Sequence, residues 1–349
     1  MPQKTMKAII KRNAGPGFEF GRWPVPKPGP GEILVKVKMV GICGTDVHIY
    51  DWDAWSQRRI KPPLVGGHEF MGTVAATGPG ITAVKIGDRV SAEGHIGCGI
   101  CACCRTGNGH ICDRVDIIGI DVNGCFAEYV VMPQTNIWKM DPRIPDKVAA
   151  LHDPLGNAVH AVMTAGVSAS SVLVMGTGPI GLYACTVARA AGASLVIAVD
   201  PNPMRLALAK KVGADVCLDP AKDNIVAEVK KLTHGEGPDV LLEMSGKAPA
   251  IRLGLSLVRN GGRVSLMGIP AEEVSLNLPE LIIFKGITLF GINGRRMFDT
   301  WYQCERFLTQ GKLNVDPIVT HEFKLEEFEK GFALIHQGKA AKVILHVAK

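Results

Sequence analysis

The chain has 349 residues, and this length favours two domains over a single hydrophobic core. Its hydrophobic content of 47% with 40 glycines is typical of a globular protein with many tight turns. The net charge of +6 is spread along the chain without a Lys/Arg block, so we expect neither a nucleic-acid partner nor a membrane partner.

The first part of the chain is predicted to be β-structure with long loops. Short alternating runs are separated by turn signals rich in glycine and proline, and no helical period is sustained. The predicted strands are Met6–Lys11, Glu32–Val40, Gly72–Thr77 and Arg89–Ala92.

The pattern changes near Pro154, where apolar strands begin to alternate with helical stretches. Six strands joined by helical crossovers predict a doubly wound parallel sheet. The predicted strands are Ser171–Met175, Leu195–Asp200, Asp215–Leu218, Val240–Met244, Arg263–Met267 and Thr288–Ile292. The predicted helices are 179–191, 203–211, 223–233, 248–257 and about 277–284.

The last part, from about Met297, contains two helical stretches and a final strand, Lys342–Val347. We expect it to return to the first domain, because a lone strand needs partners. The predicted domains are therefore residues 1–153 with 297–349, and residues 154–296. The N-terminus leads into a strand without the hydrophobic region of a signal peptide, so we expect a cytoplasmic protein.

Four cysteines on a glycine-containing loop have the spacing of a metal site: Cys98, Cys101, Cys104 and Cys112. In a cytoplasmic protein, clustered thiols indicate metal ligands more often than disulfides. Four thiolates satisfy a tetrahedral, structural Zn²⁺, although an iron–sulfur site has the same thiol count. Cys103 is a possible substitute for one of its neighbours in the ligand set.

A second donor set is more dispersed. Cys43, His68 and Glu69 supply a thiol, an imidazole and a carboxylate, which is the composition of an open zinc site. Asp153 is a candidate fourth ligand or proton carrier, and it is equally a candidate helix cap before Pro154. Thr45 and His48, close to Cys43, are the residue types of a proton relay; each is also a common loop residue.

The run Val172–Gly181 is a strand that leads into G-x-G-x-x-G, with the glycines at Gly176, Gly178 and Gly181. These glycines permit a tight turn, close approach of a pyrophosphate and helix–strand packing. Asp200 closes the next strand and suits the ribose hydroxyls of NAD better than a 2′-phosphate. Arg205 is interpreted as a contact to the adenine or as an ordinary solvated residue.

Taken together, these motifs resemble the zinc-dependent medium-chain dehydrogenases. The resemblance lies in residues 41–46, 67–69, 87–90, 98–112 and 176–181. Further stretches resemble the members of this family that oxidise L-threonine, and together they extend the likeness over nearly the whole chain. They are residues 47–52, 126–129, 153–160, 281–286, 299–302 and 316–321.

The resemblance implies an α/β architecture in which a GroES-like β-barrel catalytic domain accompanies a Rossmann domain. It implies NAD, two zinc ions per chain and a homotetramer. It assigns Cys43, His68 and Glu69 to a catalytic zinc and the four spaced cysteines to a structural one. Thr45 and His48 would relay the proton, and Asp153 would assist without firm zinc ligation. Residues implied in NAD contact are Ile180, Asp200, Arg205, Met267, Gly268, Ile269, Ile292 and Asn293.

Two positions depart from the family pattern. Asn293 stands where relatives often have Tyr or Thr, and Ala341 stands where Gly is common. The departure at Asn293 weakens the prediction that this residue contacts the nicotinamide end of NAD. Neither departure alters the expected chemistry.

The implied reaction is oxidation of the 3-hydroxyl of L-threonine by NAD⁺. Its product, 2-amino-3-oxobutanoate, is unstable, which implies a ligase that consumes it. One alternative is a polyol or 2,3-butanediol dehydrogenase of the same architecture. Others are a non-catalytic zinc-containing NAD-binding protein and a zinc-free quinone reductase, although neither needs Cys43, His68 and Glu69. Glu93 and His95 are further candidates for the substrate pocket.

Overall fold

The structure is a computed structural model that describes residues 4–347. The chain forms two compact units. The first comprises Met1–Asp153 with Val319–Lys349, and the second comprises Pro154–Ile318. The first boundary therefore lies where the change of sequence pattern predicted it, and the C-terminal strand returns to the first unit.

The second boundary differs from the prediction, because residues 297–318 belong to the second unit and not to the first. Helix α10 (Asp299–Thr309) lies in this segment. Behind it, Asn314 donates its backbone N–H to Thr186 Oγ1 at 3.1 Å and its side-chain amide to the Lys211 carbonyl at 2.9 Å. Two helices of the second unit thus hold the segment, and this tertiary contact leaves no mark in the local pattern.

The first unit is built on mainly antiparallel sheets, in which the last two strands of the chain pair in parallel. Its largest sheet has the order β10-β6-β5-β3-β18-β17, and β9 also pairs with β3. Smaller sheets have the orders β2-β1-β4 and β7-β8. The strands are β1 (Thr5–Lys11), β2 (Glu19–Pro24), β3 (Glu32–Gly41), β4 (Leu64–Val65), β5 (Glu69–Thr77), β6 (Arg89–Ala92), β7 (His95–Ile96), β8 (Asp116–Ile117), β9 (Tyr129–Pro133), β10 (Ile137–Lys139), β17 (Val319–Lys324) and β18 (Lys342–His346).

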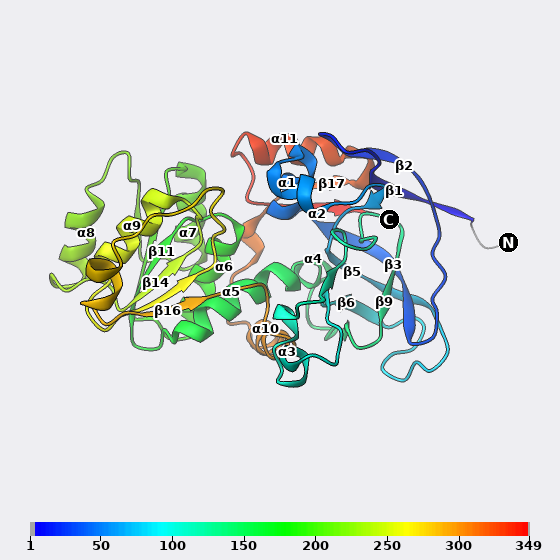
Figure 1. The fold of residues 1–349 in the computed structure, drawn as a ribbon, viewed down its shortest axis with the longest axis horizontal. Coiled ribbons are helices and arrows are strands. Elements are labelled where there is room, and N and C mark those ends of the chain that lie inside the picture. The colour runs from blue at the N-terminus through cyan, green and yellow to red at the C-terminus, as the bar shows by residue number, and fades with distance from the viewer. Residues whose placement is uncertain (1–3, 348–349) are drawn as a thin grey trace. The chain divides into compact units, whose positions relative to one another are not determined.

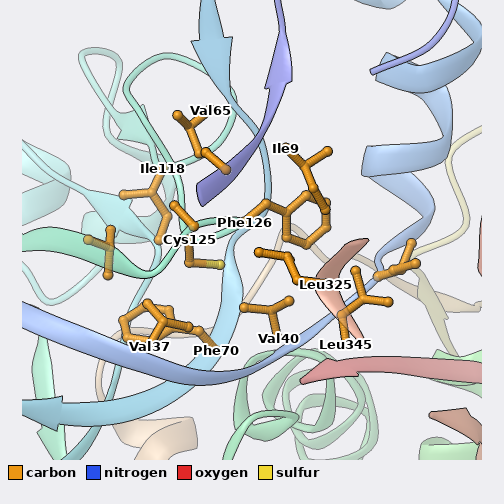
Figure 2. Packing of buried hydrophobic residues seen from close by; sticks show 14 of the residues in the cluster. Ile9, Val37, Val40, Val65, Phe70, Ile118, Cys125, Phe126, Leu325 and Leu345 are labelled. Atoms are coloured by element: carbon orange, nitrogen blue, oxygen red, sulfur yellow. The ribbon is translucent and has the colours of Figure 1, made fainter. Parts of the chain in front are cut away.

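Apolar side chains from both ends of the chain share the core of this unit. Figure 2 shows four side chains directed into one cluster: Ile9 of β1, Val40 of β3, Leu345 of β18, and Phe126 from the segment before β9. All four are buried. Alternation along each strand places these residues on the inward face. The C-terminal strand is therefore part of the core and supports the strands that carry the candidate site.

The expectation of a first part without helices was wrong. Short helices interrupt the loops: α1 (Gly44–Asp51), α2 (Ala54–Arg59), α3 (Ala102–Arg105) and α4 (Asp146–Ala149), with α5 (His152–Ala165) following and α11 (Phe328–His336) near the C-terminus. Helices of four to eight residues span one or two turns, so they show no repeated hydrophobic period. Capping contacts identify them instead, such as the Asp53 carboxylate that accepts from the Ser56 N–H at 2.8 Å.

The second unit contains the predicted parallel sheet, with the strand order β13-β12-β11-β14-β15-β16 (Figure 1). Its strands are β11 (Ser171–Met175), β12 (Leu195–Val199), β13 (Val216–Leu218), β14 (Val240–Glu243), β15 (Arg263–Leu266) and β16 (Thr288–Gly291). The helices are α6 (Pro179–Ala190), α7 (Pro203–Val212), α8 (Ile225–Leu232) and α9 (Ala248–Leu257), and a short π-helical turn covers Pro279–Ile283.

The direction of the strand order reverses between β11 and β14, which is where a doubly wound sheet opens at its carboxyl edge. Right-handed crossovers place α6 and α7 on one face and α8 and α9 on the other. All six strands and four of the helices lie where the alternation of apolar runs predicted them. Among the described residues, no helix is both long and apolar enough to cross a membrane.

Candidate active site

The register of two antiparallel strands brings Cys43, His68 and Glu69 together. Strand β3 pairs with β5 so that Gly41 lies opposite Glu69. Cys43 follows β3 by two residues, and His68 directly precedes β5, so both side chains occur at one end of the same pairing. Their ligand atoms, with one from Glu69, all lie within 4.8 Å of one another. The pairing of these two strands thus brings together Cys43 and His68, which are 25 residues apart in the sequence.

The Glu69 carboxylate is fully buried and paired with the ammonium of Lys342. Lys342 Nζ lies 2.8 Å from each carboxylate oxygen and 3.0 Å from the Ile42 carbonyl oxygen, to which it also donates. Burial on its own lowers the pKa of Lys342, but the charges of Glu69 and Cys43 outweigh it and raise that pKa. Lys342 therefore stays protonated beside the donor set.

Gly41 provides the space in which this carboxylate lies. A Cβ at Gly41 would be only 2.1 Å from Glu69 Oε2 and 2.9 Å from Leu151 Cδ2. Any side chain there would displace the carboxylate. Position 41 therefore requires glycine, because the Glu69 carboxylate lies too close to its backbone for a side chain to fit.

His68 is surrounded by negative charge. Its Nδ1 lies 3.7 Å from Asp46 Oδ1, and neither atom has a hydrogen-bond partner among the described residues. Burial lowers the pKa of His68, but the charges of Cys43 and Asp46 overcome this effect and raise the pKa to about 10. Burial raises the pKa of Asp46 to about 6. One buried imidazole among several acidic groups is a set that a divalent cation would neutralise, so the donors fit zinc.

Thr45 and His48 lie on helix α1, whereas the sequence pattern suggested a loop. Their spacing of three residues places them on one face of the helix. Thr45 Oγ1 is 3.8 Å from Cys43 Sγ. The His48 side chain is 61% exposed, and its Nδ1 lies 2.7 Å from Asp53 Oδ2. Thr45 therefore lies close to the Cys43 thiol, and His48 is open to water.

Asp153 is buried near this group but outside the set of three donors. A Cβ on Gly94 would lie 3.7 Å from Asp153 Oδ2 and 3.8 Å from His68 Cβ, so the two residues flank the same glycine. Its charge also helps to raise the pKa of His68. Asp153 lies in the first turn of α5, which begins one residue earlier, at His152.

Glu93 and His95 form a separate buried pair. Glu93 Oε1 lies 2.8 Å from His95 Nδ1 and accepts from the His95 N–H at 3.0 Å. Asn136 donates its side-chain amide to the carbonyl oxygens of both residues. The pair is held rigidly in the first unit.

The four spaced cysteines come together as their pattern predicted. The ligand atoms of Cys98, Cys101, Cys104 and Cys112 lie within 4.8 Å of one another, and Cys103 is outside the group. Cys101 Sγ and Cys112 Sγ are 3.7 Å apart. Backbone N–H groups of Ile100 and Cys101 lower the pKa of the Cys98 thiol to about 6. The four sulfur atoms are therefore close enough together to bind one structural zinc ion.

In the second unit, the glycine loop joins β11 to α6. Gly176 has φ of +88°, and a Cβ there would be 2.7 Å from that of Ser245. A Cβ on Gly181 would be 2.0 Å from the Gly176 carbonyl oxygen, so the helix packs tightly against the turn. At Gly178 a Cβ would contact nothing within 4 Å. The open space lies over the N-terminus of α6, where a pyrophosphate would bind.

The other cofactor candidates follow the carboxyl ends of neighbouring strands. Asp200 follows β12, and its carboxylate accepts from the N–H groups of Thr177 and Asn202 at 2.7 and 2.8 Å. These contacts orient it, and each oxygen keeps a lone pair for a ribose hydroxyl. The remaining candidates lie on α6 and α7 or follow β15 and β16: Ile180, Arg205, Met267, Gly268, Ile269, Ile292 and Asn293. Ile269 is 91% exposed, which is unusual for isoleucine and leaves its side chain available to a ligand.

Four residues with clear roles in this geometry had none in the sequence interpretation. Asp46 lies beside His68, Asp53 beside His48, and Lys342 beside Glu69. Glu243, buried at the end of β14, accepts from the N–H groups of Ser245 and Gly246 and so orders the loop next to Gly176. A signal existed for Lys342 and Glu243, because each is a charged residue next to a run of three apolar residues at the end of a strand.

A GroES-like domain and a Rossmann domain define one class. Residues 29–143 match the alcohol dehydrogenase GroES-like domain, and residues 179–310 match the zinc-binding dehydrogenase family. The chain belongs to the zinc-binding dehydrogenases, as its motifs indicated.

Among its relatives, L-threonine 3-dehydrogenase of Bacillus licheniformis is 48% identical over 98% of this chain and 99% of its own length. The enzyme of the same name from Pyrococcus horikoshii is 48% identical over 98% of both chains. Among solved structures, 2R,3R-butanediol dehydrogenase from Bacillus subtilis matches with a TM-score of 0.88 and 28% identity, over 98% of this chain and all of the other. The short chain alcohol dehydrogenase of Escherichia coli CFT073 complexed with NADH matches with a TM-score of 0.91 and 27% identity, over 99% and 100%.

Proposed function

We propose that this dehydrogenase oxidises the 3-hydroxyl of L-threonine to 2-amino-3-oxobutanoate with NAD⁺ as the oxidant. The observation that carries the proposal is the likeness, at 48% identity over nearly the full length, to relatives named L-threonine 3-dehydrogenase. The likeness to a butanediol dehydrogenase is more distant, at 28% identity.

We assign one zinc ion to Cys43, His68 and Glu69 and a second to the four spaced cysteines. Support comes from the two donor groups and from the excess of negative charge around the buried His68. An ion at the first site would supply Lewis acidity that lowers the pKa of the substrate hydroxyl. The four-thiolate site leaves no open position and would stabilise the loop.

The proton leaves through this chain's own side chains. The Thr45 hydroxyl accepts it near the metal ligands and passes it toward His48, which releases it to water. Asp53 holds the His48 ring through Nδ1 at 2.7 Å, which leaves Nε2 as the ring nitrogen that would take up the proton. The buried Asp153 carboxylate assists by its negative charge close to His68.

Bound NAD⁺ would supply the acceptor for the hydride that leaves C3 of the substrate. We propose that the cofactor binds at the carboxyl edge of the parallel sheet, with its pyrophosphate at Gly176–Gly181 and its ribose on Asp200. Arg205, Met267–Ile269 and Ile292–Asn293 complete the contacts. The orientation of the Asp200 carboxylate by two backbone N–H groups supports this assignment.

A steady-state assay of NAD⁺ reduction tests the substrate. L-threonine is expected to give the highest kcat/KM, well above sorbitol and 2,3-butanediol. A preference for sorbitol or for 2,3-butanediol would replace the proposal with a polyol dehydrogenase or a butanediol dehydrogenase, respectively. NADP⁺ tested in parallel is expected to be the poorer oxidant.

Metal analysis tests the site assignment. The wild-type chain is expected to contain two zinc ions and Cys43→Ser only one, with turnover lost and the fold kept. Two zinc ions in the Cys43→Ser chain would refute the ligand assignment. One zinc in the wild type would instead favour a non-catalytic zinc-containing protein.

We propose a cytoplasmic homotetramer that acts beside a ligase. None of the ten cysteines, all within the described part of the chain, forms a disulfide, in keeping with a reducing compartment. Strand β16 forms one edge of the sheet, and Ile283, Phe284 and Leu289 nearby are exposed, which supports pairing with a second copy. The product is a β-keto acid that decarboxylates unless a ligase consumes it. Light scattering is expected to give four chains for the wild type and fewer for Phe284→Asp.

A further inference from the structure

The buried contact between Lys342 and Glu69 has a role that the metal assignment does not explain. An ammonium group has three donors, and Lys342 directs them at Glu69 Oε1, Glu69 Oε2 and the Ile42 carbonyl oxygen. The two side chains are 2% and 0% exposed, so water does not compete. Lys342 is saturated and fixed in place.

The position of Lys342 is set by backbone pairing. Strand β18 pairs antiparallel with β3, with Ile344 opposite Gly41, and Ile42 donates its N–H to the Val343 carbonyl oxygen at 3.0 Å. The contact therefore joins the metal-ligand segment to the C-terminal strand. Strand β18 also pairs with β17 on its other side, so the backbone at Lys342 is held in place from both sides.

Glu69 consequently lies between two cationic sites. One of its oxygens is within 4.8 Å of the Cys43 and His68 ligand atoms, while both are 2.8 Å from Lys342 Nζ. A carboxylate oxygen has two lone pairs, so Glu69 is able to contact both cations. Each cation weakens the attraction of Glu69 for the other, since like charges repel across this buried space.

We propose that Lys342 is a positioning residue that competes with zinc for Glu69, so that Glu69 is a weak, exchangeable ligand while Cys43 and His68 hold the metal. A second consequence is that Glu69 keeps a counter-charge when the ion is absent, and the site stays folded. This inference rests on the zinc assignment made above for Cys43, His68 and Glu69.

Zinc retention by the full-length protein tests the proposal. Wild type and Lys342→Met are purified with zinc and titrated with EDTA, and zinc per chain is measured by mass spectrometry. The measured quantity is the EDTA concentration at which half of the more labile zinc has been removed. Removing the competing ammonium is expected to raise this concentration at least about tenfold. If Lys342→Met loses zinc at the same EDTA concentration as wild type or at a lower one, the proposal is overturned. A lysine with only a structural role would not weaken zinc binding, so its removal would not improve zinc retention.

Companion variants isolate the cause. Lys342→Arg keeps the charge and is expected to restore wild-type retention, and Lys342→Gln replaces Lys342→Met if the latter does not fold. Lys11→Met is the matched control, since Lys11 is also fully buried in this unit but donates only to backbone carbonyls, including Ile49 at 2.7 Å. It is expected to leave zinc retention unchanged; a tenfold gain there would overturn the specific role of Lys342.

Two further measurements separate this inference from the assignment beneath it. Lys342→Met is also made in a Glu69→Gln background. The gain in zinc retention that it causes there is expected to be at least threefold smaller than the gain that it causes in the wild type. An equal gain would overturn competition through Glu69. If Cys43→Ser loses one zinc and Lys342→Met changes nothing, only the role of Lys342 fails. If Cys43→Ser keeps both ions, the zinc site itself fails.

Discussion

Replacing Gly41 with alanine tests the packing that holds Glu69. The new Cβ would lie 2.1 Å from Glu69 Oε2, so the carboxylate must move by roughly 1 Å to reach an ordinary van der Waals distance. It cannot do so freely, because Lys342 Nζ is 2.8 Å from both oxygens and is itself fixed. Leu151 Cδ2, at 2.9 Å, blocks relaxation on another side.

The magnitude follows from the buried ion pair. Separating the partners of such a pair costs about 3–5 kcal/mol, and overpacking alone costs about 1–3 kcal/mol. We expect Gly41→Ala to lose about 3 kcal/mol. For a unit of this size that corresponds to a fall in Tm of about 6–12 °C for the first unit.

Differential scanning calorimetry with a parallel zinc measurement is the assay. Gly44→Ala is the matched control, because a Cβ there contacts nothing within 4 Å and Gly44 begins helix α1. We expect its Tm to stay within about 2 °C of the wild type or to rise. A Gly41→Ala protein with the stability and zinc content of Gly44→Ala would show that Glu69 is free to move, which would refute the packing argument.

Three further changes test other parts of the molecule. Asp53→Ala removes the partner of the His48 ring and is expected to lower kcat/KM about threefold to tenfold at neutral pH without loss of zinc; an unchanged kcat/KM would contradict the relay. Asp200→Ala removes the proposed ribose acceptor and is expected to raise the KM for NAD⁺ at least about tenfold and to narrow the preference over NADP⁺. Asp239→Asn is a stability test, since burial raises the pKa of Asp239 while hydrogen bonds from Ser171 and the Arg259 charge lower it below its ordinary value of 3.8. The ionised Asp239 carboxylate therefore stabilises the fold fully at pH values above its ordinary pKa of 3.8. This stabilisation is lost as the pH falls through the lower pKa of the folded state. We expect the variant to be less stable than wild type by about 2 kcal/mol at pH 7, and this difference to shrink as the pH falls through the folded-state pKa of Asp239, as measured by urea unfolding.

Most of the secondary structure of the second unit could be predicted from local pattern. The apolar runs at Ser171–Met175 and Val240–Glu243 are buried on both faces, so each has a continuous hydrophobic signature. The short helices of the first unit could not be predicted this way. Helix α1 has eight residues and is stabilised at its start by the Asp46 carboxylate, which accepts from the Cys43 N–H at 2.8 Å.

The sequence by itself determined the chemistry of the candidate site. Metal-ligand types at regular spacing, a strand leading into a glycine loop, and an acid closing the next strand are local patterns. They predict a zinc lobe and a cofactor edge, because metal ligation and a tight phosphate-binding turn each require particular residue types.

Only the tertiary structure decided which distant residues complete those patterns. The pairing of β3 with β5 joins Cys43 to His68 and Glu69, and the pairing of β18 with β3 brings Lys342 to the same carboxylate. Strand register acts between residues far apart in the chain, so a local pattern does not record it. For the same reason, residues 297–318 belong to the second unit: hydrogen bonds from Asn314 to two helices hold them there, despite a sequence that suggested otherwise.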